Sequence, residues 1–394
     1  MAEKTEQSAL QAPELDERGL PDLPFLLLTV ILVVIGVIML FSASYASAYA
    51  DPNIHNSAYY FVRQGSFALG GFAAMWLISR INYQAFRFFS FFVLAGSVLL
   101  LFLVPLIGES ENGATRWISL FGISFQPSEL AKVGVVMVFA ALMSIWRDRM
   151  RSFRYGVAPY LLIMGVIAFL LYLEPHLSAT LILIMTGAVM MLLGGTDKKW
   201  LIALAIIAAG LLAVYLMTKG YSGDRIKAWL HPEEYAADEG YQVIQSRYAI
   251  GSGGLTGLGF GKSRQKYLYL PEEHNDYIFA IVCEELGFVG AVLILLLFAL
   301  LILRGYWISM HARDRFGALL SAGLITLIGL QVLLNIGVVT NLLPSTGISL
   351  PFFSYGGTAL LVNLAEMGMI LSVSRQNTNR LVMKRRTGRA GGKA

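Results

Sequence analysis

The chain has 394 residues, of which 56% are hydrophobic and 14% are charged, with a formal net charge of +5 at pH 7 and a mean hydropathy of +0.64. A soluble domain carries roughly 25% charged residues, so this composition excludes a water-soluble globular protein. The single cysteine, Cys283, excludes an intramolecular disulfide and a cysteine-based metal cluster. The basic residues gather in short loops and in the C-terminal tail, and nucleic-acid binding is not predicted.

The apolar residues come in runs of about 20, the length that a helix needs to cross ~30 Å of hydrocarbon. Because the bilayer core offers no water to backbone groups, such runs must form helices. The sequence therefore predicts an all-α polytopic membrane protein with about ten transmembrane helices. The predicted segments lie approximately at residues 23–44, 58–79, 87–106, 127–146, 158–173, 177–194, 199–217, 276–303, 315–343 and 356–373.

Lys and Arg in alternate short loops predict the orientation, because cytoplasmic loops carry an excess of these residues. Both termini are predicted to be cytoplasmic. Residues 1–22 are interpreted as a cytoplasmic tail and not as a cleaved signal peptide. Residues 23–374 form the predicted membrane domain, and residues 375–394 a basic cytoplasmic tail that contacts anionic lipid. The large polar loop 218–275, between the seventh and eighth segments, is then extracytoplasmic.

This loop has a basic stretch. Between Gly240 and Pro271 it contains no acid, and its charged residues are all basic. Such a block beside a membrane surface suits an anionic headgroup such as a pyrophosphate. The alternative is a solvated basic face that only touches lipid phosphates. The basic residues are Arg247, Lys262, Arg264 and Lys266.

The same loop contains a Gly-rich run, 251–263, that ends in Gly-Lys-Ser. A nucleotide-binding P-loop requires glycine at position 256, where this chain has Thr256, and no buried strand precedes the run. A dinucleotide fingerprint fails because its third glycine position is Lys262. We reject both motifs and interpret the glycines as allowing close backbone approach to a ligand or membrane surface, or as a flexible loop.

Asp276 lies where the basic loop re-enters an apolar segment, which makes it the main candidate for a catalytic or metal-binding carboxylate. The alternative is an N-terminal helix cap. Glu129 and Lys132, at the start of the fourth segment, share one helix face. Charged residues in a membrane helix usually line a functional path. The alternative is a mutually neutralising pair that only holds helices together.

The segment 344–355 is rich in Pro, Gly and Ser, yet it is apolar and lacks Lys and Arg. This composition predicts a re-entrant loop packed within the protein. Gln331, Asn335 and Asn341 nearby are expected to bridge helices or to bind sugar. The five histidines are scattered without metal-ligand spacing, so a structural zinc site is not predicted.

Seven short motifs follow one another through the membrane region. Each is weak alone, and their combination and order are specific. They are RWI (Arg116–Ile118), QPSELAK (Gln126–Lys132), GYQxxQS (Gly240–Ser246), AIGSGG (Ala249–Gly254), LPEEHNDYIFA (Leu270–Ala280), EELGFVG (Glu284–Gly290) and LPxTGISLPFFSYGG (Leu343–Gly357).

In this combination the chain resembles the SEDS proteins (shape, elongation, division and sporulation). The amino-acid sequence of residues 263–276 and 346–361 is closer to the FtsW and SpoVE branches than to the RodA branch. One departure is 174–178, where the family often has an acid in place of His176 and glycine in place of Ser178. This departure leaves a role for position 176 open.

The resemblance implies a peptidoglycan glycosyltransferase of the bacterial cytoplasmic membrane, with its active face outside, that polymerises lipid II for division or sporulation. The acceptor 4-hydroxyl attacks C1 of the donor with inversion, and undecaprenyl pyrophosphate leaves. Asp276 matches the family's essential carboxylate, as general base or as ligand of a divalent cation, Mg²⁺ or Mn²⁺. No organic cofactor is expected. A class B penicillin-binding protein and other division proteins are the expected partners.

The substrate-binding prediction extends beyond Asp276. Some of its residues match positions of the family motifs, and the loop lysines are our inference for holding the pyrophosphate. The predicted substrate- and pyrophosphate-binding residues are Arg63, Arg116, Glu129, Lys132, Lys262, Lys266, His274 and Ser354.

Other functions fit parts of the sequence. A lipid II flippase or other transporter would depend on gated cavities and on intramembrane charges such as Glu284 and Glu366. A non-catalytic scaffold of the division machinery would tolerate loss of the Asp276 carboxylate. Transfer to another lipid-linked acceptor fits the chemistry but not the motif set.

Overall fold

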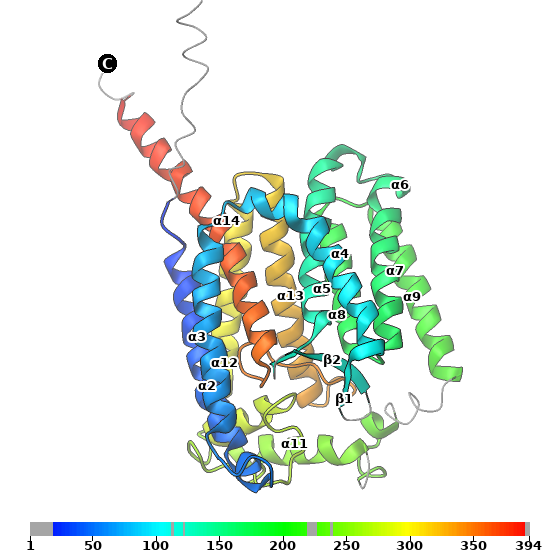
Figure 1. Cartoon of the computed structure of the whole chain (residues 1–394), viewed down its shortest axis with the longest axis vertical. Helices are drawn as coiled ribbons and strands as arrows, with labels where there is room; N and C mark the ends of the chain where they lie inside the picture. The colour runs from blue at the N-terminus through cyan, green and yellow to red at the C-terminus, as the bar shows by residue number, and fades with distance from the viewer. Residues whose placement is uncertain (1–18, 112–113, 121–122, 219–226, 237–238, 391–394) are drawn as a thin grey trace, which may run out of the picture.

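Each predicted apolar segment coincides with a helix in the computed structural model, which describes residues 19–111, 114–120, 123–218, 227–236 and 239–390 (Figure 1). These helices are α2 (Leu23–Ala50), α3 (Tyr59–Arg80), α4 (Tyr83–Ile107), α5 (Pro127–Ile145), α7 (Ala158–Leu173), α8 (Leu177–Leu193), α9 (Lys198–Thr218), α12 (Ile278–Met310), α13 (Arg315–Val339) and α14 (Gly357–Ala390).

Seven helical spans among the described residues are long and apolar enough to cross a membrane. The chain is therefore a helical membrane protein, as predicted. Ten crossings stay a prediction, because α8 has only 17 residues and α3 and α9 are not among those seven spans. The helix α14 continues to Ala390, into the segment predicted as a basic tail.

Local sequence explains where several helices begin. The Asp22 carboxylate accepts a hydrogen bond from the Phe25 amide at 3.0 Å and caps α2. Asn82 and Asp314 cap α4 and α13 in the same way, which satisfies backbone donors that a helix N-terminus otherwise leaves unpaired. Pro127 occupies the first turn of α5, where its fixed backbone angle suits a helix and its missing amide proton is not needed.

The centre of the bundle is formed by α5 and α13, which contact each other. In their most apolar stretches, 78% of α5 and 83% of α13 are buried, compared with 22% of α4 and 28% of α12. The outer helices thus present apolar side chains outward, where a membrane protein meets lipid. The central helices carry several buried polar residues, among them Glu129, Lys132 and Asn335.

The start of the described chain and α14 near Arg375 meet at one end of the bundle, which we call the terminal end, and α14 projects beyond it (Figure 1). The Gly19 amide donates to the Arg375 carbonyl at 3.1 Å. The Arg304 guanidinium binds the Asp22 carboxylate through two contacts, at 2.9 and 2.7 Å. The N- and C-terminal segments are therefore on the same side of the bundle, in agreement with the predicted alternation of loops.

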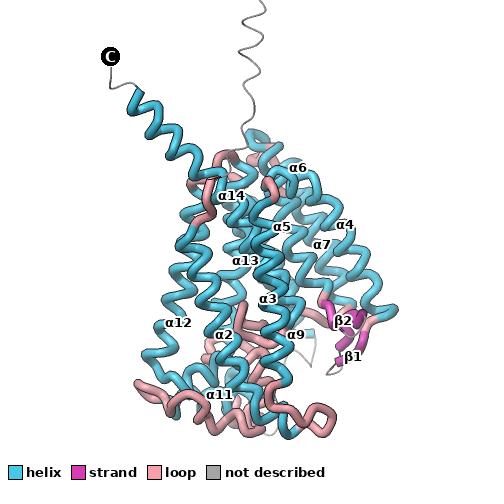
Figure 2. Tube along the Cα trace, turned by 60° about the vertical axis from the view of Figure 1, so that its left-hand side comes forward, coloured by secondary structure: helices cyan, strands magenta, loops and turns pink. Residues whose placement is uncertain are grey.

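The opposite end, which we call the loop end, contains two elements that the sequence did not predict (Figures 1 and 2). A three-stranded antiparallel sheet, β1 (Glu109–Glu111), β2 (Ala114–Leu120) and β3 (Ile123–Phe125), lies between α4 and α5. The helix α11 (Glu239–Gly253) lies inside the large polar loop. This loop is therefore partly helical, and α11 packs against α12.

The helix α12 begins at Ile278 and is broken at Gly287, whose backbone has φ 69° and ψ −171°. The residues 254–259 fill the break: the Leu258 and Gly259 amides donate to the carbonyls of residues 284 and 285, at 3.0 Å each. A Cβ atom on Gly287 would lie 2.2 Å from the Gly257 amide nitrogen. Only glycine allows this close approach of two backbones.

The segment 344–356 is non-helical and lies inside the bundle, as predicted. Leu350 and Phe353 are fully buried. The Ser354 hydroxyl accepts a hydrogen bond from the Leu350 amide at 2.7 Å. From α3, the buried Gln64 side chain donates to the Ser354 carbonyl at 3.1 Å and accepts from the Gly356 amide at 3.2 Å. These side-chain contacts satisfy backbone groups that have no helical partner.

Candidate active site

Asp276 lies in the turn that precedes α12, and its backbone is fixed from two sides. The carbonyls of residues 274–276 each accept a hydrogen bond: from the Tyr355 amide at 2.9 Å, the Ser354 hydroxyl at 2.7 Å and the Asn335 side-chain amide at 2.7 Å. Asn335 also donates to the Ile348 carbonyl at 2.7 Å. The bridging role expected for Asn335 is thus observed, and it joins the Asp276 turn to α13 and to the buried segment 344–356.

The Asp276 carboxylate does not cap α12. The N-cap position is Tyr277, and no side chain caps that helix. The carboxylate instead lies against Gly347, where a Cβ atom would be 3.1 Å from its Oδ2 atom. Gly347 also has a positive φ of 70°, so glycine is favoured there for two independent reasons.

The surroundings raise the pKa of Asp276 to about 7. Burial is the main cause, and the negative charge of Glu272 adds to it, while Arg116 and His274 act in the opposite direction. A carboxyl group that titrates near neutral pH is suited to act as a general base, because it can both accept and release a proton under working conditions.

Arg116, on β2, links the sheet to the turn between α7 and α8. Its Nε atom donates to the Glu174 carbonyl at 3.4 Å, and its guanidinium also donates to the Pro175 carbonyl. From this position its charge lowers the pKa of both Asp276 and Glu174. The motif residue Arg116 is therefore close enough to act electrostatically on the Asp276 carboxylate, and its contact with substrate stays a prediction.

The α7–α8 turn contributes two buried titratable groups that the sequence left without a role. Glu174 is 1% exposed and His176 is 7% exposed. Burial raises the pKa of Glu174 to about 8, against the effect of Arg116. Burial, followed by the charges of Arg116 and Lys132, lowers the pKa of His176 to about 3. Both shifts favour the neutral form of the side chain, and no sequence motif indicated this burial.

Glu129 and Lys132 form a buried ion pair on α5, with Lys132 Nζ 2.9 Å from Glu129 Oε1. Glu366, buried on α14, interacts electrostatically with both residues. The charge of Lys132 also reaches His176. The predicted pair thus interacts with His176 in the α7–α8 turn and with Glu366 on α14. Both of its side chains are buried.

Arg63 and His274 belong to one aromatic cluster at the loop end. Arg63 donates to the Tyr59 hydroxyl at 2.8 Å. The ring of Tyr60 lies 4.6 Å from that of His274 and 4.7 Å from that of Tyr355, measured between centroids. The three tyrosines were not singled out in the sequence, although Tyr355 is part of a quoted motif.

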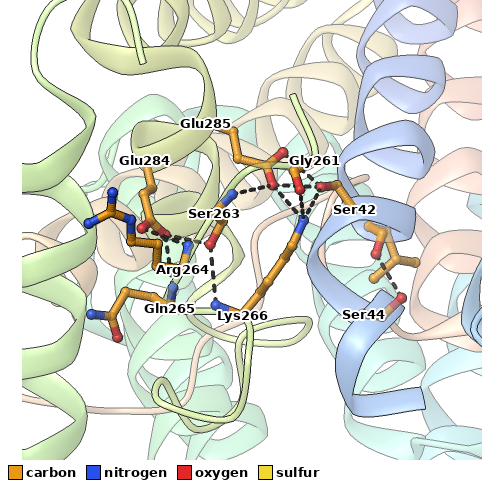
Figure 3. A network of polar contacts seen from close by, with 10 residues as sticks. Ser42, Ser44, Gly261, Ser263, Arg264, Gln265, Lys266, Glu284 and Glu285 are labelled. Atoms are coloured by element: carbon orange, nitrogen blue, oxygen red, sulfur yellow. Dashed lines mark hydrogen bonds and ion pairs between the residues drawn. The ribbon is translucent and has the colours of Figure 1, made fainter. Parts of the chain in front are cut away.

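The structure separates the two predicted lysine ligands. Lys262 is exposed on the loop, whereas Lys266 is 2% exposed. The Lys266 ammonium lies 3.0 Å from Glu285 Oε1 and donates to the Gly261 carbonyl at 2.7 Å and to the Ser42 hydroxyl at 3.2 Å (Figure 3). An ammonium has three donors, and all three are in use here. In this arrangement Lys266 is unsuited to bind a pyrophosphate, so we omit it from the site proposed below.

A divalent cation has limited support from the protein's own ligands. Among the described residues, no group of three or more His, Cys, Asp or Glu side chains is placed to hold a metal ion. Mg²⁺ is often held by one or two carboxylates together with substrate phosphates and waters. Asp276 fits such a cation as one ligand only, with the other ligands supplied by the substrate, and the cation stays a prediction.

These features define the chain as a polytopic membrane protein with a carboxyl group of raised pKa, Asp276, held in a fixed turn at the loop end. Residues 23–379 match the family of cell cycle proteins FtsW, RodA and SpoVE. The chain belongs to this family, which confirms the resemblance drawn from its motifs.

Two curated relatives are each 40% identical to the chain. One is the probable peptidoglycan glycosyltransferase FtsW of Geobacter sulfurreducens, aligned over 355 residues, 90% of this chain and 95% of the relative. The other is stage V sporulation protein E of Bacillus subtilis, aligned over 357 residues, 90% of this chain and 97% of the relative.

Solved structures agree with the fold. A chain from a peptidoglycan synthase complex, studied for its structural coordination of polymerization and crosslinking, has a TM-score of 0.76 at 29% identity, covering 91% of this chain and 98% of that chain. The rod shape determining protein RodA of Thermus thermophilus has a TM-score of 0.67 at 28% identity, covering 91% and 97%. The predicted similarity to the FtsW and SpoVE branches is confirmed by the two relatives that are 40% identical to the chain.

Proposed function

We propose that the protein is a peptidoglycan glycosyltransferase that polymerises lipid II into glycan strands. The observation that carries the proposal is the Asp276 carboxyl group. Its backbone is fixed by three hydrogen bonds to residues 274–276, its pKa is about 7, and the charge of Arg116 acts on it. The name of one relative, probable peptidoglycan glycosyltransferase FtsW, supports the same activity.

In the proposed reaction, Asp276 accepts the proton of the acceptor 4-hydroxyl while the hydroxyl oxygen attacks C1 of the donor sugar. The bond between C1 and the pyrophosphate oxygen breaks, with inversion at C1, and undecaprenyl pyrophosphate leaves with the bonding electron pair. Arg116 and the exposed Lys262 offset the charge that develops on the pyrophosphate. A divalent cation, when bound, would supply further positive charge at the leaving group.

The other predicted residues take supporting places in this proposal. Ser354 holds the Asp276 turn through its hydroxyl. Arg63 and His274 present an aromatic and basic surface toward the sugar headgroup. Glu129 and Lys132 form the polar interior next to the α7–α8 turn. A lipid-linked anionic substrate needs apolar surface for its tail and cations for its pyrophosphate, and this end of the bundle offers both.

We place the protein in the bacterial cytoplasmic membrane with both termini cytoplasmic and the loop end outside. The basic loops on the side of the termini support this orientation. A class B penicillin-binding protein is the proposed partner in division or sporulation. Support comes from the structural neighbour, which belongs to a complex that coordinates polymerization and crosslinking.

The test is polymerisation of labelled lipid II by the purified protein, with and without a cognate transpeptidase. Glycan strands on a gel, lost on chelation and restored by Mg²⁺ or Mn²⁺, are the expected result. Absence of strands even with the partner, together with lipid II translocation in vesicles, would contradict the proposal and favour a flippase.

A further inference from the structure

Two consecutive acids on α12, Glu284 and Glu285, are both 1% exposed and both bind the loop that precedes Asp276 (Figure 3). Burying a carboxylate without polar partners costs folding free energy. Both side chains therefore need hydrogen bonds or ion pairs inside the protein. They connect α12, the loop residues 263–266 and α2. The site described above does not use this network.

Glu285 is the charged centre of the network. Its Oε1 atom lies 3.0 Å from Lys266 Nζ and accepts a hydrogen bond from the Ser263 amide at 3.2 Å. The hydroxyl of Ser42, on α2, donates to its two oxygens at 2.7 and 2.8 Å. The position of α2 is therefore tied to α12 and to the loop at one point.

Glu284 binds the next part of the loop. Its oxygens accept hydrogen bonds from the amides of Arg264 at 3.0 Å and Gln265 at 3.3 Å. The Ser263 hydroxyl donates to it as well, and the same hydroxyl accepts from the Lys266 amide at 3.2 Å. Glu284 thus holds three successive loop residues: Ser263 through its hydroxyl, and Arg264 and Gln265 through their backbone amides.

These contacts close the loop at its base. The chain leaves the network at Lys266, passes through Asp276 and returns to the network at Glu284, so the catalytic turn lies on a closed segment. Its far side is the hydrogen-bonded turn 274–276. Between them, Leu268 and Glu272 have positive φ values of 66° and 55°, a strained conformation that persists only where the surroundings enforce it.

We propose that Lys266, Glu284 and Glu285, with Ser263 and Ser42, form a positioning clamp that sets the place of the Asp276 carboxylate. The inference rests on the proposed function. Lys266 acts through the loop and does not touch the substrate, which replaces its predicted role as a pyrophosphate ligand. Because small displacements of a catalytic group reduce the rate steeply, loosening the clamp lowers turnover more than substrate binding.

The test compares Lys266→Met and Ser263→Ala with wild type in lipid II polymerisation and in hydrogen–deuterium exchange. We expect kcat to fall about 10-fold or more, because a misplacement of about 1 Å can cost about 100-fold. KM is expected to change less than about twofold, since uniform binding is kept. Exchange is expected to accelerate in residues 266–277 and to stay at wild-type rates in α5 and α13. Arg264→Ala is the control for the exchange measurement, because its side chain is exposed and only its backbone amide joins the clamp.

A raised KM with unchanged kcat in Lys266→Met would overturn the clamp and return Lys266 to the phosphate ligands. Reduced thermal stability with wild-type kcat per folded molecule and wild-type exchange would also overturn it. Removal of one partner of a buried ion pair is destabilising, so the double variant Lys266→Met/Glu285→Gln tests the same prediction without a stranded charge. The exchange result does not depend on catalysis, so it separates failure of the clamp from failure of the proposed glycosyltransferase.

Discussion

The side-chain amide of Asn335 donates to the backbone carbonyl of Asp276 at 2.7 Å. Asn335 is fully buried on α13, one of the two central helices, and it also holds the Ile348 carbonyl at 2.7 Å. One side chain therefore fixes the position of the Asp276 backbone relative to the bundle core and to the segment 344–356. This relationship explains how a loop residue can be as well positioned as a residue within a helix.

Asn335→Asp is expected to disturb this arrangement without changing its volume. The new carboxylate lacks the amide donors, and each buried carbonyl left unsatisfied costs about 1–3 kcal/mol. We expect the kcat for lipid II polymerisation to fall by about 10-fold or more, with thermal stability reduced. The comparison is Asn341→Asp, whose side chain does not contact the Asp276 turn. Equal activities of the two variants would show that the Asn335 contact is dispensable.

The pH dependence of activity tests the environment of Asp276. Because its pKa is about 7, the ionised base is populated above that pH, so kcat/KM is expected to rise with pH through a midpoint near 7. The charge of Glu272 raises this pKa, and its removal in Glu272→Gln is expected to move the midpoint to lower pH. A midpoint that stays in place, or moves upward, would contradict the proposed electrostatics.

The exposed Lys262 tests the pyrophosphate contact. Lys262→Ala is expected to raise the KM for lipid II several-fold at low salt with little change in kcat. The difference from wild type should shrink at high ionic strength, because salt screens exposed charges. Lys199→Ala removes another exposed cation, which is paired with Asp197 at 3.2 Å, and serves as the control. A Lys262→Ala effect that is independent of salt would argue against an electrostatic contact.

The orientation is tested by cysteine labelling in a Cys283→Ala background. Thr256 and Ser152 are both exposed, and the predicted topology places them on opposite sides of the membrane. A membrane-impermeant maleimide applied to intact cells is expected to label Thr256→Cys and to label Ser152→Cys only after permeabilisation. The reverse pattern would invert the topology and place Asp276 in the cytoplasm.

Much of the fold is readable from the sequence because hydrophobic length and period dominate in a membrane. The start of α2 after Asp22 and the first turn of α5 at Pro127 follow from local capping rules. The break in α12 at Gly287 does not follow from such rules, because it depends on hydrogen bonds between the α12 backbone and the distant residues 254–259. The sheet β1–β3 and α11 were missed for a similar reason: polar segments without clear periodicity take their structure from the elements beneath them.

The sequence predicts which residues belong to the candidate site, and the structure shows how they are arranged. Arg116 acts electrostatically on Asp276, which agrees with their assignment to one site. Lys266 shows the limit of a charge count: a lysine in a basic loop is equally consistent with a phosphate ligand and with a buried partner of Glu285. The burial of Glu174 depends on how α7 and α8 pack, which a single sequence does not specify.

The central claim is that Asp276 performs the chemistry of a lipid II polymerase. Its most direct test is the strand-forming activity of the purified Asp276→Asn variant beside wild type, with the cognate transpeptidase present and folding checked by thermal unfolding. The isosteric amide cannot act as a base, so we expect a folded protein that makes no glycan strands while wild type does. Wild-type strand formation by Asp276→Asn would contradict the account.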